Sequence, residues 1–160
     1  MKPESTLPPP EVVARRGTAW QDQDAGDIFG IMQARGLISP DLKIAGQSYA
    51  GLVHRYERLI GAPICATQQE EGGRGTAPED PVGYARSRAR MLASLAVLRR
   101  LDHRCLVAMA RAVAAVTHEQ IADTLQWAAW IAPALQALHE AADEIRAAGR
   151  TAAGAMMEAA

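Results

Sequence analysis

Residues 84–113 contain seven arginines and a single acidic residue, Asp102, in a segment otherwise rich in alanine and leucine. At about 100° per residue, a helix over this segment predicts that five of the arginines share one face. These five are Arg86, Arg90, Arg100, Arg104 and Arg111. The opposite, apolar face carries Met91, Leu95, Leu98, Cys105, Met109 and Val113. Because guanidinium groups stay charged and bind phosphate oxygens bidentately, such a basic face is typical of a phosphate-binding surface.

Lys43 and Arg58 add two cations on the outer side of a helix expected over residues 40–60. With the five arginines, they complete the predicted contacts to nucleic acid. Two other interpretations stay open. In the first, acids in residues 118–125 and 133–146 neutralise the arginine face within the fold. In the second, the arginines meet the acids of a protein partner. The alternatives differ in whether the arginines point to open solvent or lie against those acids.

Patterns that carry catalysis or bind metals are missing. The four histidines are His54, His103, His118 and His139. They form no His-x3-His or His-Glu-x-x-His pair, and the chain has no Gly-x-Ser-x-Gly elbow. Neither Cys65 nor Cys105 has an obvious neighbouring base, and the glycine-rich EGGRG at residues 71–75 lacks the lysine of a phosphate-binding loop. We therefore expect no catalytic residue, no metal and no cofactor, and a protein that is not an enzyme.

The composition predicts a single all-α domain. The chain has 160 residues, of which 49% are hydrophobic, enough to bury a core. Alanine and leucine favour helix, whereas the alternating pattern of strands is nearly absent. No apolar run approaches the roughly 20 residues that span a bilayer, and the first residues lack a signal-peptide core. We expect a cytoplasmic protein that has no membrane partner.

Helix signals divide the chain into three parts. Residues 1–18 predict a disordered, proline-rich arm, residues 19–148 a helical domain, and residues 149–160 a flexible tail. The first helix is expected over residues 22–34, and Ser39 caps a second one that ends at Gly61. Asp80 and Pro81 start the arginine-rich helix, which bends at Asp102 or breaks there with Asp102 capping a new helix. The residues expected to face inward on the second helix are Ile44, Ala45, Tyr49, Leu52, Val53, Tyr56, Leu59 and Ile60.

Residues 117–138 are similar to a degenerate helix-turn-helix. Thr117 and Gln120 predict a capping box at a helix start, after which Ile121, Ala122 and Leu125 face inward. The second helix of such a motif should present polar side chains to base edges, but residues 128–134 read AAWIAPA. Base readout through this segment is therefore not expected.

The same segment predicts how the domain is completed. Trp127, Trp130 and Ile131 are expected to pack into the core, and Pro133 to start a final helix that ends at Gly149. The expected architecture is an antiparallel helical bundle of five or six helices that includes the helix-turn-helix-like segment.

Three segments together resemble a known group of proteins. They are AGQSYAGLVHRYERLIGAP at residues 45–63, EGGRG at residues 71–75, and THEQIADTL followed by ALQAL within residues 117–138. Over residues 40–146 the chain is similar to small helical proteins encoded by alphaproteobacterial prophages and gene-transfer-agent-like elements. The resemblance implies a divergent helix-turn-helix regulator. We therefore expect a phage-type nucleic-acid-binding accessory or regulatory protein. The alternative is a helical protein-interaction module or a homo-oligomeric, small-terminase-like packaging component.

Overall fold

The computed structural model describes residues 26–61 and 80–160, which form seven α-helices and no strand. The helices are α2 (Ile28–Ala34), α3 (Pro40–Leu59), α4 (Pro81–Arg99), α5 (His103–Ala114), α6 (His118–Leu125), α7 (Ala128–Glu140) and α8 (Ala142–Glu158). The predicted all-α class is confirmed, and the described helices outnumber the five or six that were expected. The predicted arm at residues 1–18, Cys65 and the EGGRG segment lie outside the described residues.

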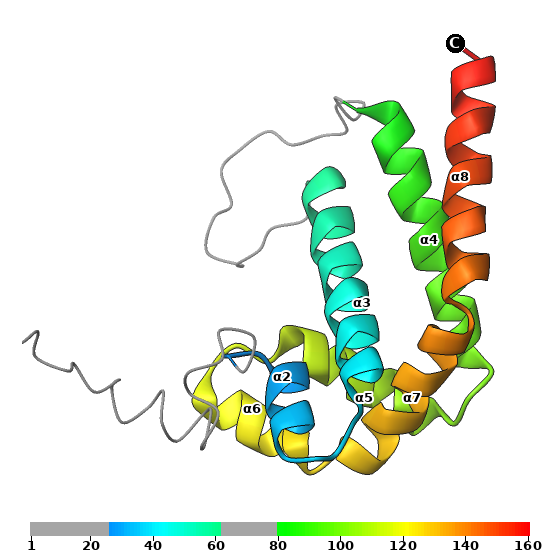
Figure 1. Cartoon of the computed structure of the whole chain (residues 1–160). Helices are drawn as coiled ribbons and strands as arrows, with labels where there is room; N and C mark the ends of the chain where they lie inside the picture. Colours follow the sequence, from blue (N-terminus) through cyan, green and yellow to red (C-terminus); the bar gives the residue numbers. More distant parts are fainter. Residues whose placement is uncertain (1–25, 62–79) are drawn as a thin grey trace, which may run out of the picture.

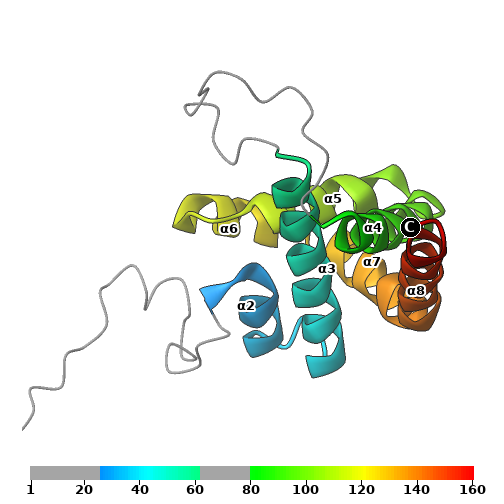
Figure 2. The same ribbon diagram turned by 90° about the horizontal axis from the view of Figure 1, so that it is seen from above.

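Three long helices stand side by side and the shorter ones pack around their lower half (Figure 1). The middle one, α4, runs antiparallel to both α3 and α8. Seen from above, α3 separates α2 and α6 on one side from α4, α5, α7 and α8 on the other (Figure 2). The core is therefore shared by both sides of α3. Its largest fully buried side chains are Phe29, Ile28, Ile31, Met32, Leu98, Met109, Ile131 and Leu135.

Side-chain caps fix where α2 and α3 begin. Asp27 caps α2 by accepting a hydrogen bond from the Gly30 amide at 2.6 Å, so this helix begins six residues after the predicted Asp22. The other oxygen of Asp27 accepts from Gln47 Nε2 at 2.9 Å, which joins α2 to α3. Ser39 caps α3 as predicted, with its hydroxyl oxygen 3.3 Å from the Leu42 amide nitrogen.

The arginine-rich segment is two helices. As predicted, Asp80 and Pro81 start α4. Of the two alternatives at Asp102, the break is observed, because the Asp102 carboxylate accepts from the Arg104 amide at 2.9 Å and caps α5. The periodicity of one continuous helix therefore does not extend across Asp102. The predicted common face of five arginines is wrong for this physical reason.

The helix-turn-helix-like segment is confirmed only in its first cap. Thr117 and Gln120 form the capping box of α6, with hydrogen bonds of 3.2 and 3.1 Å. Ala122 is exposed although it was expected to face inward. Pro133 does not start a helix, because α7 begins five residues earlier and Pro133 lies inside it, on the exposed side.

The apolar residues of the same segment lie largely in the core. Ile131 is fully buried, and Trp127 and Trp130 are half-buried against the core. Ala134, Leu135 and Leu138 complete the buried side of α7. This helix is therefore chiefly a core element.

The last helix corrects the predicted flexible tail. A separate helix, α8, begins at Ala142 and continues through Gly149 to Glu158. Gly149 and Ala153 are buried against α4, and a Cβ atom at Gly149 would lie 2.7 Å from Arg90 Cγ. Gly149 therefore allows α4 and α8 to approach each other closely and does not end α8. Within the described ranges, no helix is long and apolar enough to cross a membrane.

Candidate anion-binding site

Three arginines lie near enough to Arg90 to act on its charge, and we call these four residues, which come from three helices, the arginine cluster. They are Arg55 of α3, Arg86 and Arg90 of α4, and Arg146 of α8. Burial lowers the pKa of Arg90, and the positive charges of Arg55, Arg146 and Arg86 lower it further. Arginine stays protonated at neutral pH in spite of such shifts. The cluster is thus a concentration of fixed positive charge.

Arg90 is the most enclosed member of the cluster. Its Nε atom is buried without a hydrogen-bond partner among the described residues. Its aliphatic stem packs beside Gly149, where only a glycine leaves room for it. A buried guanidinium N–H without an acceptor costs free energy.

Carboxylates do not neutralise most of the cluster within residues 26–61 and 80–160. The ion pairs found there join Arg146 to Asp143 and, at 3.6 Å, His54 to Glu57. Arg55, Arg86 and Arg90 take part in neither. The expectation that acids of the C-terminal helices neutralise the arginine face is therefore not met by an ion pair in the described ranges, because Asp143 pairs with Arg146 of its own helix, which is not part of that face. An exposed pair of this kind contributes little to stability and can open to admit another anion.

Two of the predicted contacts have aromatic neighbours instead. The Arg104 guanidinium lies 4.9 Å from the ring centre of Trp130, and that of Arg111 lies 4.8 Å from the ring centre of Trp127. Both distances are typical of cation–π pairs. These pairs fasten α5 to α7 and to the α6–α7 connection. Arg104 and Arg111 therefore have a structural contact that the members of the arginine cluster lack.

The other predicted contacts lie apart from both groups on the chain. Arg100 is exposed at the C-terminal cap of α4, and Arg58 is exposed in the last turn of α3. Lys43 is half-buried in the first turn of α3. Of the seven predicted residues, the cluster thus contains two, Arg86 and Arg90.

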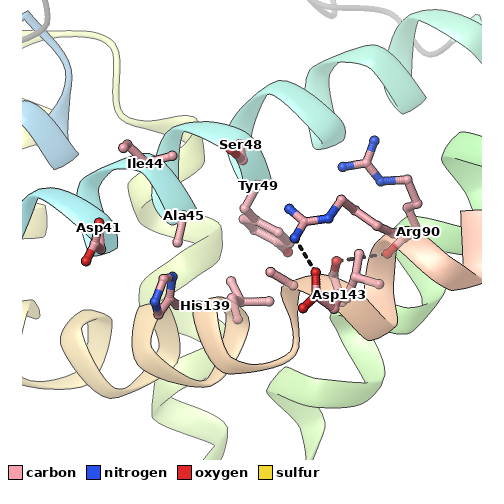
Figure 3. A pocket seen from close by; sticks show the side chains of 13 residues that line it. Asp41, Ile44, Ala45, Ser48, Tyr49, Arg90, His139 and Asp143 are labelled. Carbon is pink, nitrogen blue, oxygen red and sulfur yellow. Dashed lines mark hydrogen bonds and ion pairs between the residues drawn. The ribbon is translucent and has the colours of Figure 1, made fainter.

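A pocket of about 450 Å³ opens beside the arginine cluster, between α3, α4 and the junction of α7 with α8. Figure 3 shows Asp41 and His139 at one end of this pocket and Arg90 at the other. Arg146 also lines it. Tyr49 stands between the two ends, and burial raises the pKa of its hydroxyl, which keeps that group neutral. The pocket therefore has the Arg90 guanidinium at one end, with the Asp143 carboxylate toward that side, and offers a carboxylate and an imidazole at the other end.

An apolar groove of about 530 Å³ lies on the other side of Tyr49, between α3, α4 and α5. Val53, Leu95, Leu106 and Val113 line it. Met91 and Leu95, which were predicted to face the core, border this groove and are half-buried. The groove offers contact area and few polar groups.

The described part of the chain shows no cluster of metal ligands, and its one described cysteine is buried. No group of three or more His, Cys, Asp and Glu side chains is placed there to hold a metal ion. Cys105 is buried, and burial followed by the charge of Asp102 raises the pKa of its thiol. A thiol with a raised pKa is a poor nucleophile at neutral pH.

Sequence reasoning missed Arg55 and Arg146, because they belong to other helices than the arginine-rich segment. One signal was available: both lie in helices with small residues at close-packing positions, such as Gly149 in α8. No family model, curated protein or solved structure matches this chain. The geometry and charge of the described residues therefore carry the functional argument alone.

Proposed function

We propose that this protein binds nucleic acid through the phosphate backbone, using the arginine cluster, and that it acts as a non-enzymatic accessory or regulatory protein of the prophage type. One observation supports this most directly. Three helices bring four guanidinium groups together, and only Arg146 has a carboxylate partner among the described residues. Crowded like charges destabilise the fold unless an anion relieves them. A chain of phosphates is the anion that offers several charges at a fixed spacing.

The proposal assigns little sequence specificity to the binding. The residues of α7 that point outward are Ala129, Pro133, Gln136, His139 and Glu140. The Gln136 amide donates to Glu140 at 2.8 Å, which engages the side chain best suited to reading a base edge. The helix-turn-helix-like segment of α6 and α7 therefore enters the proposal as scaffold, with phosphate contacts supplying the affinity.

Salt-dependent binding tests the proposal. Fluorescence anisotropy is measured with a random-sequence duplex and a single strand at about 50 and about 200 mM salt. Replacing Arg55 and Arg86 with glutamine removes two exposed cluster charges. We expect weaker binding and a salt slope that is shallower by about two, one for each lost phosphate contact.

The matched control removes the same charge elsewhere. Arg104→Gln with Arg111→Gln takes two arginines from the tryptophan faces, and we expect a nearly unchanged salt slope. Circular dichroism establishes that both double variants are folded. The proposal fails if the unaltered protein does not bind at the lower salt concentration. It also fails if the two double variants lose the same affinity, because the cluster would then have no special role.

A second candidate function, a protein-interaction module or homo-oligomeric packaging component, is favoured by the apolar groove beside Tyr49. Val116, which lines this groove, is 68% exposed. Exposed aliphatic side chains beside a groove are typical of helix-in-groove interfaces. Light scattering across a range of protein concentrations tests this function. A concentration-dependent mass that is lost in Val116→Asp would support it, and a constant monomer mass would exclude self-association.

A further inference from the structure

The pocket beside the arginine cluster has the polarity of one nucleotide. Its walls follow α3 from Asp41 to Tyr49, eight residues that rise about 12 Å at the helical 1.5 Å per residue. Arg90 lines one end and Asp41 and His139 the other, and Arg146 is also part of the lining. We infer that this pocket binds a nucleoside 5′-monophosphate unit, with its phosphate on Arg90 and Arg146 and its base toward Asp41 and His139. This inference rests on the proposed function and names the ligand of the same site.

The end of the pocket that holds Arg90 can receive a phosphate without rebuilding the fold, although the Asp143 carboxylate also lines the pocket toward that end. A guanidinium group carries five N–H donors, so the ion pair of Arg146 with Asp143 leaves donors for a second anion. Arg90 lies beside it, and within the described residues it has no carboxylate partner. Two guanidinium groups on one phosphate allow bidentate, charge-assisted hydrogen bonds, which are the strong ones.

Part of the pocket wall is aliphatic and open to solvent. Ile44, expected from the sequence to face the core, is 57% exposed and lines the pocket with Ala45, Leu138 and Ile145. Covering a large, solvent-exposed aliphatic side chain with a flat ring removes apolar surface from water and so favours binding. Sugar and base together would cover this wall. A free inorganic phosphate would leave it exposed.

The far end supplies groups that recognise a base. The Asp41 carboxylate accepts hydrogen bonds only, so it selects base edges that present N–H donors. His139 can donate or accept, according to its protonation state. Guanine, adenine and cytosine carry an exocyclic amino group, whereas uracil and thymine present a single N3–H between two carbonyl oxygens, which repel a carboxylate. The pocket is therefore expected to prefer the three amino-bearing bases. Its volume of about 450 Å³ is within the usual range for small-ligand sites.

Calorimetric titration of the full chain tests the inference with AMP, GMP, CMP and UMP. Inorganic phosphate and the unphosphorylated nucleosides are the reference ligands. We expect the amino-bearing nucleotides to bind more tightly than UMP, phosphate or any nucleoside. Arg146→Gln should weaken nucleotide binding about tenfold or more, as the loss of a charge-assisted bond implies. Arg150→Gln, at an exposed position one turn further along α8, is the matched control and should change nucleotide binding by less than about twofold.

A second variant tests independently whether the Asp41 end of the pocket recognises the base. Asp41→Asn keeps the size of the side chain and adds a donor, so it should reduce the preference for amino-bearing bases over UMP. The inference is overturned if no nucleotide binds, if phosphate alone binds as tightly as the nucleotides, or if Arg150→Gln weakens binding as much as Arg146→Gln. Arg146 is exposed, so its replacement leaves the core intact.

The source of the nucleotide is decided by a further comparison. Oligonucleotides with a 5′-phosphate and with a 5′-hydroxyl are titrated beside the free mononucleotides. Tighter binding of the phosphorylated strand shows that the pocket holds a strand end, and equal binding of both strands assigns it to free nucleotide. If the random duplex binds and no mononucleotide does, this inference is wrong and the proposed function is unaffected. Failure of both duplex and single strand removes the proposed function instead.

Discussion

At the scale of single residues, arginine side chains lie in three different kinds of surroundings. Arg104 and Arg111 lie over tryptophan rings, Arg146 pairs with Asp143, and Arg90 has an enclosed Nε without a partner. Each surrounding predicts a different consequence of substitution. A ring contact contributes to stability, an exposed ion pair contributes little, and an unneutralised charge is available to a ligand.

Arg104→Gln is expected to lower the free energy of unfolding by about 0.5–1 kcal/mol, because a cation over an indole face is lost. Urea denaturation measures the change, and Arg100→Gln is the control, since Arg100 is exposed and has no ring contact among the described residues. A double-mutant cycle with Trp130→Leu isolates the pair. An additive cycle would show that the contact between Arg104 and Trp130 contributes nothing.

Two glycines of α3 are expected to respond in opposite directions. A Cβ atom at Gly46 would lie 2.5 Å from Phe29 Cδ1 in the core, so Gly46→Ala should cost about 1–3 kcal/mol through overpacking. No described atom lies within 4 Å of a Cβ at exposed Gly51, so Gly51→Ala should stabilise by about 0.5–1 kcal/mol through helix propensity. Thermal and urea unfolding compare the two. Equal effects would contradict the close contact between α2 and α3.

At the scale of elements, capping residues decide where helices begin, and their sequence signals are local. Ser39, Asp80, Asp102 and Thr117 cap the helices that the sequence assigned to them. Helix ends that depend on packing are harder to predict from the sequence. Pro133 lies within α7 and Gly149 within α8, because the buried sides of both helices continue past them. Burial of those sides outweighs the local preference of either residue.

Pro133→Ala is expected to raise the free energy of unfolding by about 1–2 kcal/mol. Proline lacks the N–H that would bond to the Ala129 carbonyl, and alanine restores it, while loss of proline's stiffness in the unfolded chain offsets part of the gain. Pro133 is exposed, so no core contact is removed. Chemical denaturation measures the difference, with Gln136→Ala as an exposed control on the same helix. A destabilised variant would show that α7 requires the geometry that proline imposes.

At the scale of the whole molecule, the antiparallel pairing of α4 with α8 builds the candidate site. The pairing brings residues 86 and 90 beside residue 146, and α3 adds residue 55 from the other side (Figure 1). The pocket lies where α3 meets this pair. Loss of the end of α8 should therefore affect both stability and ligand binding.

Truncation after Ala148 is expected to destabilise the domain by about 2 kcal/mol, because buried Gly149 and Ala153 leave the face of α4. The control is removal of the exposed Ala159 and Ala160, which should have no measurable effect. Urea unfolding of both truncated chains gives the comparison. An unaffected free energy of unfolding would restore the sequence-based interpretation of residues 149–160 as a tail that contributes nothing to the fold.

The sequence by itself determined the all-α class, the start of α4 and the caps at Ser39 and Thr117, since these depend on neighbours within one helical turn. At Asp102 it left a bend and a break open, and the structure decided for the break. It also pointed to arginine as the residue type of interest. Only the tertiary structure decided which arginines lie together. Arg55 and Arg146 are 91 positions apart in the chain, and packing of α3, α4 and α8 brings both to Arg90. The break at Asp102 sends Arg104 and Arg111 to the tryptophans instead, because helical periodicity places side chains only within one unbroken helix.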